Sequence, residues 1–524
     1  MRQGSQPYRG QMADVLPDDV ATWLGSWFWA PGYDVAREVL QRGTAAVLVV
    51  AFLVVVRQWR PLLGERGLLP AATYVARTTW RDAPSVLRWR CSDRFVAALA
   101  WGGAGLAALL VVGVPQRGPW WLTTLAFLVL WAAYLSVVNV GQRFYGFGWE
   151  SLLCEATFLV GWLGSSGGGA APPLLVLLLT RWCLFRVELG AGLIKVRGDR
   201  AWRDLTALDH HHETQPLPGP FSWHAHHLPR WWHRVEVAGN HVTQLVVPFA
   251  LFAPQPVASV AGGVVVLTQA WLLVTGNFAW LNWLTIVLGL GVVSDGAWAA
   301  VGSWLVPALG RGEDPVPDGG AAPGGPVALV VAVLAVSALL LVLSVRPARN
   351  LVARRQLMNA SFEPFRLVNA YGAFGSVSRR RDEVVVEGTA ARFPGPDDWV
   401  EYAFRGKPGD VGRRPPQVAP YHLRLDWQMW FLALGSPGTR WFEVLLLRLL
   451  EADRPTLRLL AADPFADDPD GPAPRWVRAR VFRYRYTTRA ERRRTGDWWV
   501  REERGTLVDP VDRERLRLLL GPRA

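Results

Sequence analysis

Residues 181–241 decide the fold, and they read RWCLFRVELGAGLIKVRGDRAWRDLTALDHHHETQPLPGPFSWHAHHLPRWWHRVEVAGNH. The first part is apolar and predicts a helix. It nevertheless carries Arg181, Glu188 and Lys195, spaced seven residues apart and so two turns apart on nearly one face. The rest holds eight of the nine histidines of the chain. Charge on a helix otherwise suited to lipid is costly, so each charged side chain is expected to have a partner or a function.

The apolar runs on either side of this stretch predict a polytopic α-helical membrane protein. Of the 524 residues, 51% are hydrophobic, and several uncharged runs reach the roughly 20 residues needed to cross a bilayer. We therefore expect a polar, interfacial segment at 1–41 and a multi-span membrane domain at 42–345. The first span is expected to be centred on 45–56, and a fourth is expected to begin near Glu150. Four others are expected at about 95–114, 119–140, 172–194 and 326–345. The uncharged run 241–294 is long enough for two connected spans, or for more with re-entrant pieces.

The remainder, 346–524, is expected to be a soluble β-rich (α+β) domain. The strings DEVVVEGT, DDWVEYAF and RWVRARVFRYRYTT alternate in polarity, which predicts strands of an antiparallel sheet. Residues 436–451 predict an amphipathic helix beside it. A stretch rich in Gly, Pro and Asp at 311–325 predicts a flexible linker before the last span.

The net charge of +13 does not predict binding of nucleic acid. Basic residues fall mostly in loops and in the C-terminal part, as membrane proteins often have them in loops, and no nucleic-acid-binding motif is evident. Only two of the 56 basic residues are lysines, Lys195 and Lys407. The abundance of Arg, Ala, Gly and Pro suggests a GC-rich bacterial genome, and hence the bacterial cytoplasmic membrane. A lysine retained against this bias is a candidate for a specific role, because a buried lysine can lose its proton and an arginine cannot.

The histidines suggest a metal at first, but their arrangement does not favour one. Zinc needs three or four converging ligands, whereas the adjacent histidines at 210–212 point in different directions. Several prolines are expected to keep the middle of 196–240 extended and to exclude pairs at helical spacing. The three cysteines form no CxxC pair. We predict no metal, no cofactor, and a compact loop in which Trp and Pro pack around hydrogen-bonded His and Asp.

A carboxylate at Glu155 falls inside the expected fourth span. It is either paired with Arg181 or Arg186 of the next helix or protonated, and pairing is favoured because unpaired buried carboxylates are rare.

Several long strings of the chain resemble the lipase maturation factor family. That resemblance implies a non-enzymatic factor that assists folding of secreted lipases in the endoplasmic reticulum membrane. The lipid bilayer and a secreted client, such as a lipase, would then be its partners. The strings are GLIKVRGDRAWRDLTALDHHHETQPLPGPFSWHAHHLP (192–229), GNHVTQLVVPF (239–249), TGNFAWLNWLT (275–285), NAYGAFGSVSRRRDEVVVEGT (369–389) and APYHLRLDWQMWFLALG (419–435).

The candidate motif and interaction residues come from these strings and from the charged apolar helices. Arg424, Asp426 and Trp427 among them suit either a protein interface or a packed corner where the soluble domain docks. The full set is Glu155, Arg181, Glu188, Asp199, Trp202, Arg203, Asp204, Asp209, His211, Glu213, His226, His227, His233, Asn240, His241, Tyr371, Arg424, Asp426 and Trp427.

A second, fainter resemblance concerns Lys195. The string AGLIKVRGDRAW (191–202) is similar to part of the membrane domain of vitamin K-dependent carboxylases, where a lysine in this context serves as a base. The resemblance implies an alternative function, an integral membrane enzyme that uses Lys195 as its base. The simpler hypothesis is an ion pair of Lys195 with Glu188 or Asp199 that fixes the helix end.

Two cues to the topology disagree. The arginine-rich loop at 57–94 predicts a cytoplasmic location. The family resemblance implies that the C-terminal domain lies on the lumenal side.

Overall fold

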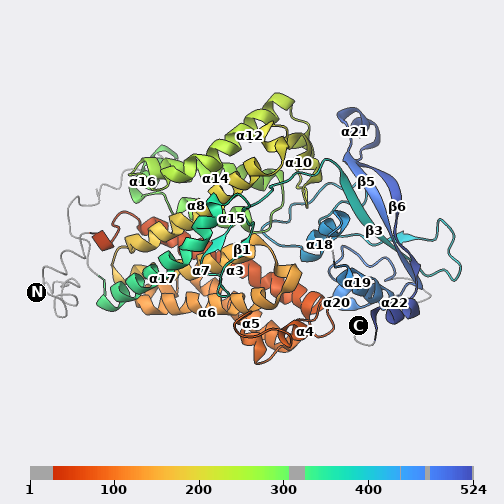
Figure 1. The fold of residues 1–524 in the computed structure, drawn as a ribbon, viewed down its shortest axis with the longest axis horizontal. Coiled ribbons are helices and arrows are strands. Elements are labelled where there is room, and N and C mark those ends of the chain that lie inside the picture. The colour runs from red at the N-terminus through yellow and green to blue at the C-terminus, as the bar shows by residue number, and fades with distance from the viewer. Residues whose placement is uncertain (1–26, 306–324, 437, 467–472, 522–524) are drawn as a thin grey trace, which may run out of the picture.

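Two parts of the molecule lie end to end, a helical bundle and a smaller part built on a β-sheet (Figure 1). The computed structural model describes residues 27–305, 325–436, 438–466 and 473–521. Most of the predicted interfacial segment and nearly all of the predicted linker fall outside these ranges. The bundle belongs to the membrane domain expected from the apolar runs.

Five described helices are long and apolar enough to cross a membrane. Each contains a long apolar run, and their partial burial within the bundle leaves apolar side chains for lipid. A sixth crossing would need two helices that meet at a bend of 98°, α15 (Leu281–Leu290) and α16 (Asp295–Leu305). The five are α3 (Asp34–Leu63), α5 (Asp93–Val111), α6 (Trp120–Val140), α14 (Val257–Thr275) and α17 (Val327–Val352).

Two further helices occupy the middle of the bundle. Helix α7 (Gly148–Val160) is buried along its whole length. With 13 residues it reaches about 20 Å, less than the roughly 30 Å of a hydrocarbon core, so the prediction of a full fourth span there is wrong. Helix α8 (Leu174–Arg197) is the charged helix that opens the deciding stretch, and it packs against α7, α12 and α17.

The histidine- and tryptophan-rich stretch after α8 is largely helical, which corrects the expectation that its middle is extended. The prolines lie between the helices or cap them, as Pro229 does, and do not interrupt them. Its helices are α9 (Arg200–Arg203), α10 (Leu208–Thr214), α11 (Ser222–His226) and α12 (Arg230–Leu245).

The C-terminal part is an antiparallel sheet with the strand order β4-β3-β5-β6 and helices against it. The three polarity-alternating strings fall on strands, although β4 is only two residues long. The predicted amphipathic helix is α19 (Arg440–Leu450). The remaining main elements are β3 (Arg381–Thr389), β4 (Val400–Glu401), β5 (Trp476–Tyr486), β6 (Trp499–Val511), α18 (Arg424–Ala433), α21 (Arg489–Thr495) and α22 (Arg513–Leu520).

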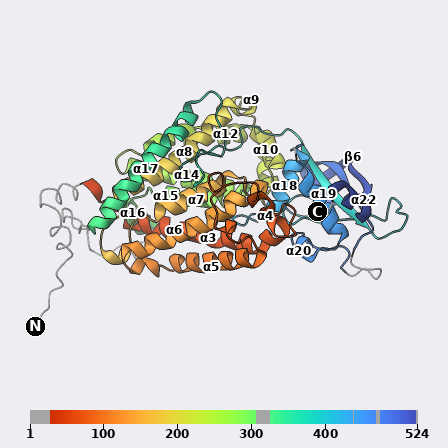
Figure 2. The ribbon, with the colours of Figure 1, turned by 60° about the horizontal axis from the view of Figure 1, so that its bottom comes forward.

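One end of the bundle carries the four-stranded sheet and the helices packed against it. Gln58, near the end of α3, donates to the carbonyl of His422 at 2.6 Å. Helix α10 lies at the same end of the bundle (Figures 1 and 2), and Trp223 of α11 donates to the carbonyl of Thr487 just after β5 at 3.0 Å. The opposite end is closed by Asp295, which accepts from the backbone nitrogens of Asp34 and Val35 at 3.0 Å. The loop at 57–94 and the C-terminal domain therefore lie on the same side of the bundle.

Candidate functional site

A cavity of about 680 Å³ lies where the bundle meets the soluble part. Its walls come from α8, α10, α12, α14 and α15, from the loop at 371–376 and from α18. Most of the exposed surface inside it is apolar, and a few polar side chains project from α8, α10 and α14. An apolar cavity with a small polar end is the usual form of a small-molecule site.

Lys195 lies near the C-terminal end of α8 in the cavity wall, with 5% of its surface exposed. Its Nζ donates to Asn240 Oδ1 at 2.8 Å and to Gln244 Oε1 at 2.9 Å, and it lies 4.7 Å from the ring centroid of Trp202. An ammonium has three donors, so one N–H is left for a ligand or water. Two amide oxygens and an aromatic face thus stabilise the cation.

Neither ion pair predicted for Lys195 is present among the described residues. Asp199 is directed away from it, because its side chain caps α9 by accepting from the Ala201 nitrogen at 2.9 Å. It also accepts from Arg379 at 2.9 Å. These hydrogen bonds hold the pKa of Asp199 below its usual value despite partial burial.

Glu188 is the second ionisable group of the cavity wall and is fully buried. Its Oε1 accepts from Gln269 Nε2 at 2.7 Å, and Gln269 Oε1 accepts from Asn282 at 2.7 Å. Its Oε2 makes no hydrogen bond of good geometry in the described part of the chain, although the Gln244 side chain lies close to the carboxylate. Gln269 and Asn282 were not among the residues predicted for the site. Their position in the charge-free run 241–294 was a usable signal, because an amide side chain without a hydrogen-bond partner is costly in lipid.

Two histidines of α10 also line the cavity. His211 lies between Phe278 and Phe374, with ring centroids at 6.3 and 5.2 Å. Burial, together with the charge of Lys195, lowers the pKa of His211 to about 4, and burial lowers that of His212 well below its usual value. Both rings are therefore neutral near pH 7, and neither nitrogen of His212 has a partner among the described residues.

The rest of the histidine-rich segment is held together by hydrogen bonds, as predicted. His233 bonds Asp209 Oδ1 at 3.1 Å and the Ala225 carbonyl at 3.0 Å. His227 bonds the Trp223 carbonyl at 2.7 Å, and His241 the Trp202 carbonyl at 3.0 Å. Within the described ranges, no group of three or more His, Cys, Asp or Glu side chains could hold a metal ion.

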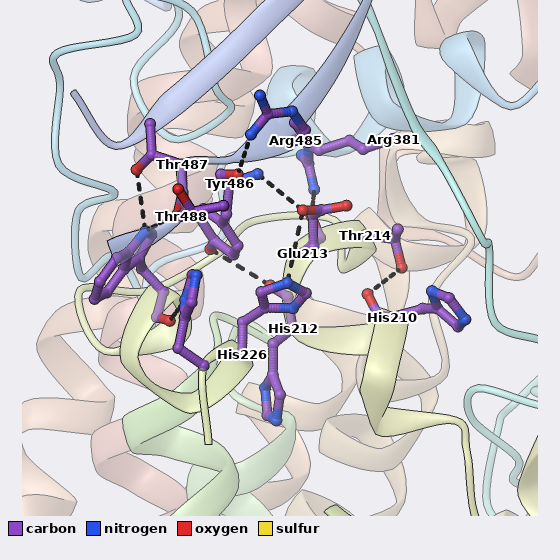
Figure 3. Close-up of polar contacts among 12 residues, drawn as sticks. His210, His212, Glu213, Thr214, His226, Arg381, Arg485, Tyr486, Thr487 and Thr488 are labelled. Atoms are coloured by element: carbon purple, nitrogen blue, oxygen red, sulfur yellow. Dashed lines mark hydrogen bonds and ion pairs between the residues drawn. The ribbon is translucent and has the colours of Figure 1, made fainter. Parts of the chain in front are cut away.

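This segment is fastened to strand β5 and its neighbour β3, as Figure 3 shows. Glu213 accepts from the backbone nitrogen of Tyr486 at 2.8 Å and lies 3.9 Å from His226. Arg381 donates to the carbonyls of Glu213 at 2.9 Å and Pro216 at 3.0 Å, and also to that of Gln215. The roof of the cavity and the soluble domain are therefore one connected unit.

A second polar cluster joins α7, α8 and the start of the soluble part. The pairing predicted for Glu155 is present, with Arg186 and not Arg181 as the partner. The same carboxylate accepts from the Asn369 backbone at 3.0 Å and from the Tyr371 hydroxyl at 2.7 Å. Arg181 lies elsewhere on α8 and donates to the Leu251 carbonyl at 3.3 Å.

The later candidates form a packed corner and not an exposed interface. Arg424, Asp426 and Trp427 are 0%, 1% and 4% exposed. Arg424 pairs with Glu150 at 2.7 Å, Asp426 accepts from the backbone nitrogen of Gly406 at 2.7 Å, and Trp427 lines the cavity. By contrast, the adjacent residues Arg203 and Asp204 lie exposed on the surface.

Comparison with known proteins extends over nearly the whole chain. Family models described as the lipase maturation factor transmembrane domain and the lipase maturation factor C-terminal domain match residues 35–300 and 367–509. Lipase maturation factor 1 of Bos taurus is 40% identical over 94% of this chain and 90% of its own length, and that of Homo sapiens is 39% identical over 94% and 89%. Lipase maturation factor 2 of Homo sapiens is 29% identical over 90% and 82%. None of the solved structures matches.

These comparisons change two expectations. The relatives named here are animal proteins, which contradicts the bacterial origin inferred from composition, since an arginine-rich composition does not identify a kingdom. Nothing in the comparisons supports the fainter resemblance to carboxylases. With both family models matched in order and a relative 40% identical over nearly its full length, the chain belongs to the lipase maturation factor family.

Proposed function

We propose that this protein is a membrane-embedded maturation factor that assists secreted lipases in reaching their active fold, and that it is an assembly factor and not an enzyme. The observation that carries the proposal is the similarity to lipase maturation factor 1, which extends over 94% of this chain. It includes the bundle, the cavity and the soluble domain, so the parts that could serve a client are all present.

The client is expected to bind on the side of the soluble domain. The histidine-rich segment after α8 lies between the bundle and the sheet and is bonded to both, so its role in this proposal is to hold the two together. Exposed apolar side chains lie nearby in the loop at 57–94, where Trp80 and Trp89 are 48% and 76% exposed with ring centroids 5.8 Å apart. Exposed aromatic side chains of this kind suit a protein partner.

We place the protein in the membrane where secreted lipases fold, which in an animal cell is that of the endoplasmic reticulum. The five apolar helices support an integral membrane location. The choice of this particular membrane follows from the client.

The test measures a secreted lipase in cells that lack their own maturation factor. Lipase activity is divided by lipase antigen, with and without this chain. The proposal predicts antigen of low specific activity without the chain and active antigen with it. An unchanged specific activity, with the chain present in the membrane at normal amount, would remove lipases as its clients.

A further inference from the structure

On one side, the cavity beside Lys195 is bounded by α12 and by α14, a candidate membrane span. Four large, partly exposed apolar side chains of its lining lie on α12 and α14, namely Trp232 (39%), Val235 (56%), Leu267 (72%) and Trp271 (37%). Leu267 lies midway along α14, a candidate membrane span. We take this exposed side of the lining as the mouth of the cavity, and because α14 is a candidate span, the mouth is expected at the depth of the bilayer.

The N-terminal end of α12 has the composition of a segment at the membrane interface. Its first turns contain exposed Trp231 and Trp232 beside exposed Arg230 and Arg234, the combination found where a helix lies at the headgroup layer. It runs alongside α14 (Figure 1). The two helices are joined by the Trp271–Glu236 hydrogen bond at 2.5 Å and by Thr243–Thr268 at 3.3 Å. Between these contacts, a side chain at Gly239 would meet nothing within 4 Å.

The inner end of the cavity has both donors and acceptors without partners. Lys195 has one N–H left, Glu188 Oε2 and Asn282 Oδ1 accept from no described residue, and the His212 nitrogens are unpartnered. Each of these side chains is at least nine-tenths buried. An unmatched buried polar group is costly, so the arrangement suits a ligand whose polar end both donates and accepts.

We propose that this cavity binds a single-chain lipid with an uncharged, hydroxylated polar end, which enters from the bilayer between α12 and α14. The positive charge of Lys195 is countered by Glu188 on the same helix, so a charged headgroup would be buried without a counter-ion. A hydroxyl accepts from Lys195 and donates to Glu188. A volume of about 680 Å³ is that of a site for one drug-sized molecule. The proposal does not depend on the lipase client.

The test uses the purified full-length protein and a photoreactive, alkyne-tagged monoacylglycerol. Unlabelled monoolein, oleate and phosphatidylcholine compete at equal concentration. We expect cross-links on α12 and α14, and competition by monoolein at least tenfold stronger than by the other two. Equal competition by oleate or phosphatidylcholine, or cross-links confined to other helices, would overturn the proposal.

Two variants locate the site. Gly239→Trp fills the mouth and should lower labelling at least tenfold. Gly263→Trp, on α14 outside the lining and equally free of neighbours, should label like the wild type. If Gly239→Trp does not fold, Glu188→Gln decides, because exchanging the carboxylate for an amide should weaken monoolein binding about tenfold. Undiminished labelling of a folded Gly239→Trp, or unchanged affinity in Glu188→Gln, would contradict the site.

Discussion

Two buried carboxylates lie in the centre of the bundle and differ in how fully they are bonded. Glu155 on α7 accepts from Arg186, Asn369 and Tyr371, which fasten α7 and α8 to the soluble part. Glu188 on α8 accepts from Gln269 through one oxygen, and its other oxygen has no partner among the described residues. The first is bonded like a structural anchor. The second is bonded like one side of a binding site that a ligand completes.

The largest effect is expected from Glu155→Gln. It leaves Arg186 as a buried cation without its counter-ion, which typically costs about 3–5 kcal/mol. The free energy of unfolding in detergent should fall by that amount, as measured by denaturant titration of tryptophan fluorescence. The matched control is Glu188→Gln, and equal losses in the two variants would remove the distinction between anchor and site.

The next effect is a dependence of stability on pH that arises on the cavity side. The pKa of His211 is lowered to about 4, so between pH 6.5 and 4 the unfolded chain binds a proton that the folded chain does not. Stability therefore decreases as the pH falls through this window, by at most about 3 kcal/mol from this histidine. His211→Gln should flatten the decrease in unfolding titrations at pH 7, 5.5 and 4.5. A variant with an unaltered profile would show that this ring is not the source.

A smaller loss is expected from Lys195→Met. This change removes two hydrogen bonds and a cation–π contact, and it leaves the oxygens of Asn240 and Gln244 without a donor. We expect a loss of about 2 kcal/mol, less than for Glu155→Gln, because the lost partners are neutral amides. The melting temperatures of the two variants in one detergent give the comparison, and a greater loss for Lys195→Met would reverse the assignment of the anchor.

The smallest effect is expected from Glu188→Gln. A glutamine oxygen can still accept from Gln269. Lys195 loses the nearby negative charge of Glu188 but keeps its hydrogen bonds to Asn240 and Gln244, so the free energy of unfolding should change by only about 1 kcal/mol. The same titration measures it. A loss of about 3 kcal/mol or more would mean that Glu188 also has a structural counter-charge.

The apolar runs and the alternating strings predicted much of the fold. A helix in lipid requires a long apolar run, and a strand with one buried face requires alternating polarity, so both can be recognised in the sequence. Helix α17 and strand β5 are examples. The helices of the histidine-rich segment were not predicted, because the prolines were expected to interrupt helices, whereas they lie between the helices. The partners of Lys195 could not be read from spacing, because Asn240 and Gln244 approach it only when α12 packs on α8.

The structure also shows that the two topology cues cannot both hold. The arginine-rich loop at 57–94 and the C-terminal domain lie at the same end of the bundle, joined through Gln58 and His422. The two therefore face the same compartment, and a cytoplasmic loop with a lumenal domain is excluded. Sequence patterns could not give this result, because it depends on how the ends of distant helices meet.

The measurement that bears most directly on an assembly role is the specific activity of a secreted lipase in factor-deficient cells that receive the wild-type chain or Lys195→Arg. Arginine keeps the cation and its donors but cannot act as a base at neutral pH. An assembly factor predicts that Lys195→Arg, present in the membrane at wild-type amount, restores more than about half of the wild-type specific activity. Complete loss of restoration at that amount would contradict an assembly role and indicate chemistry at Lys195.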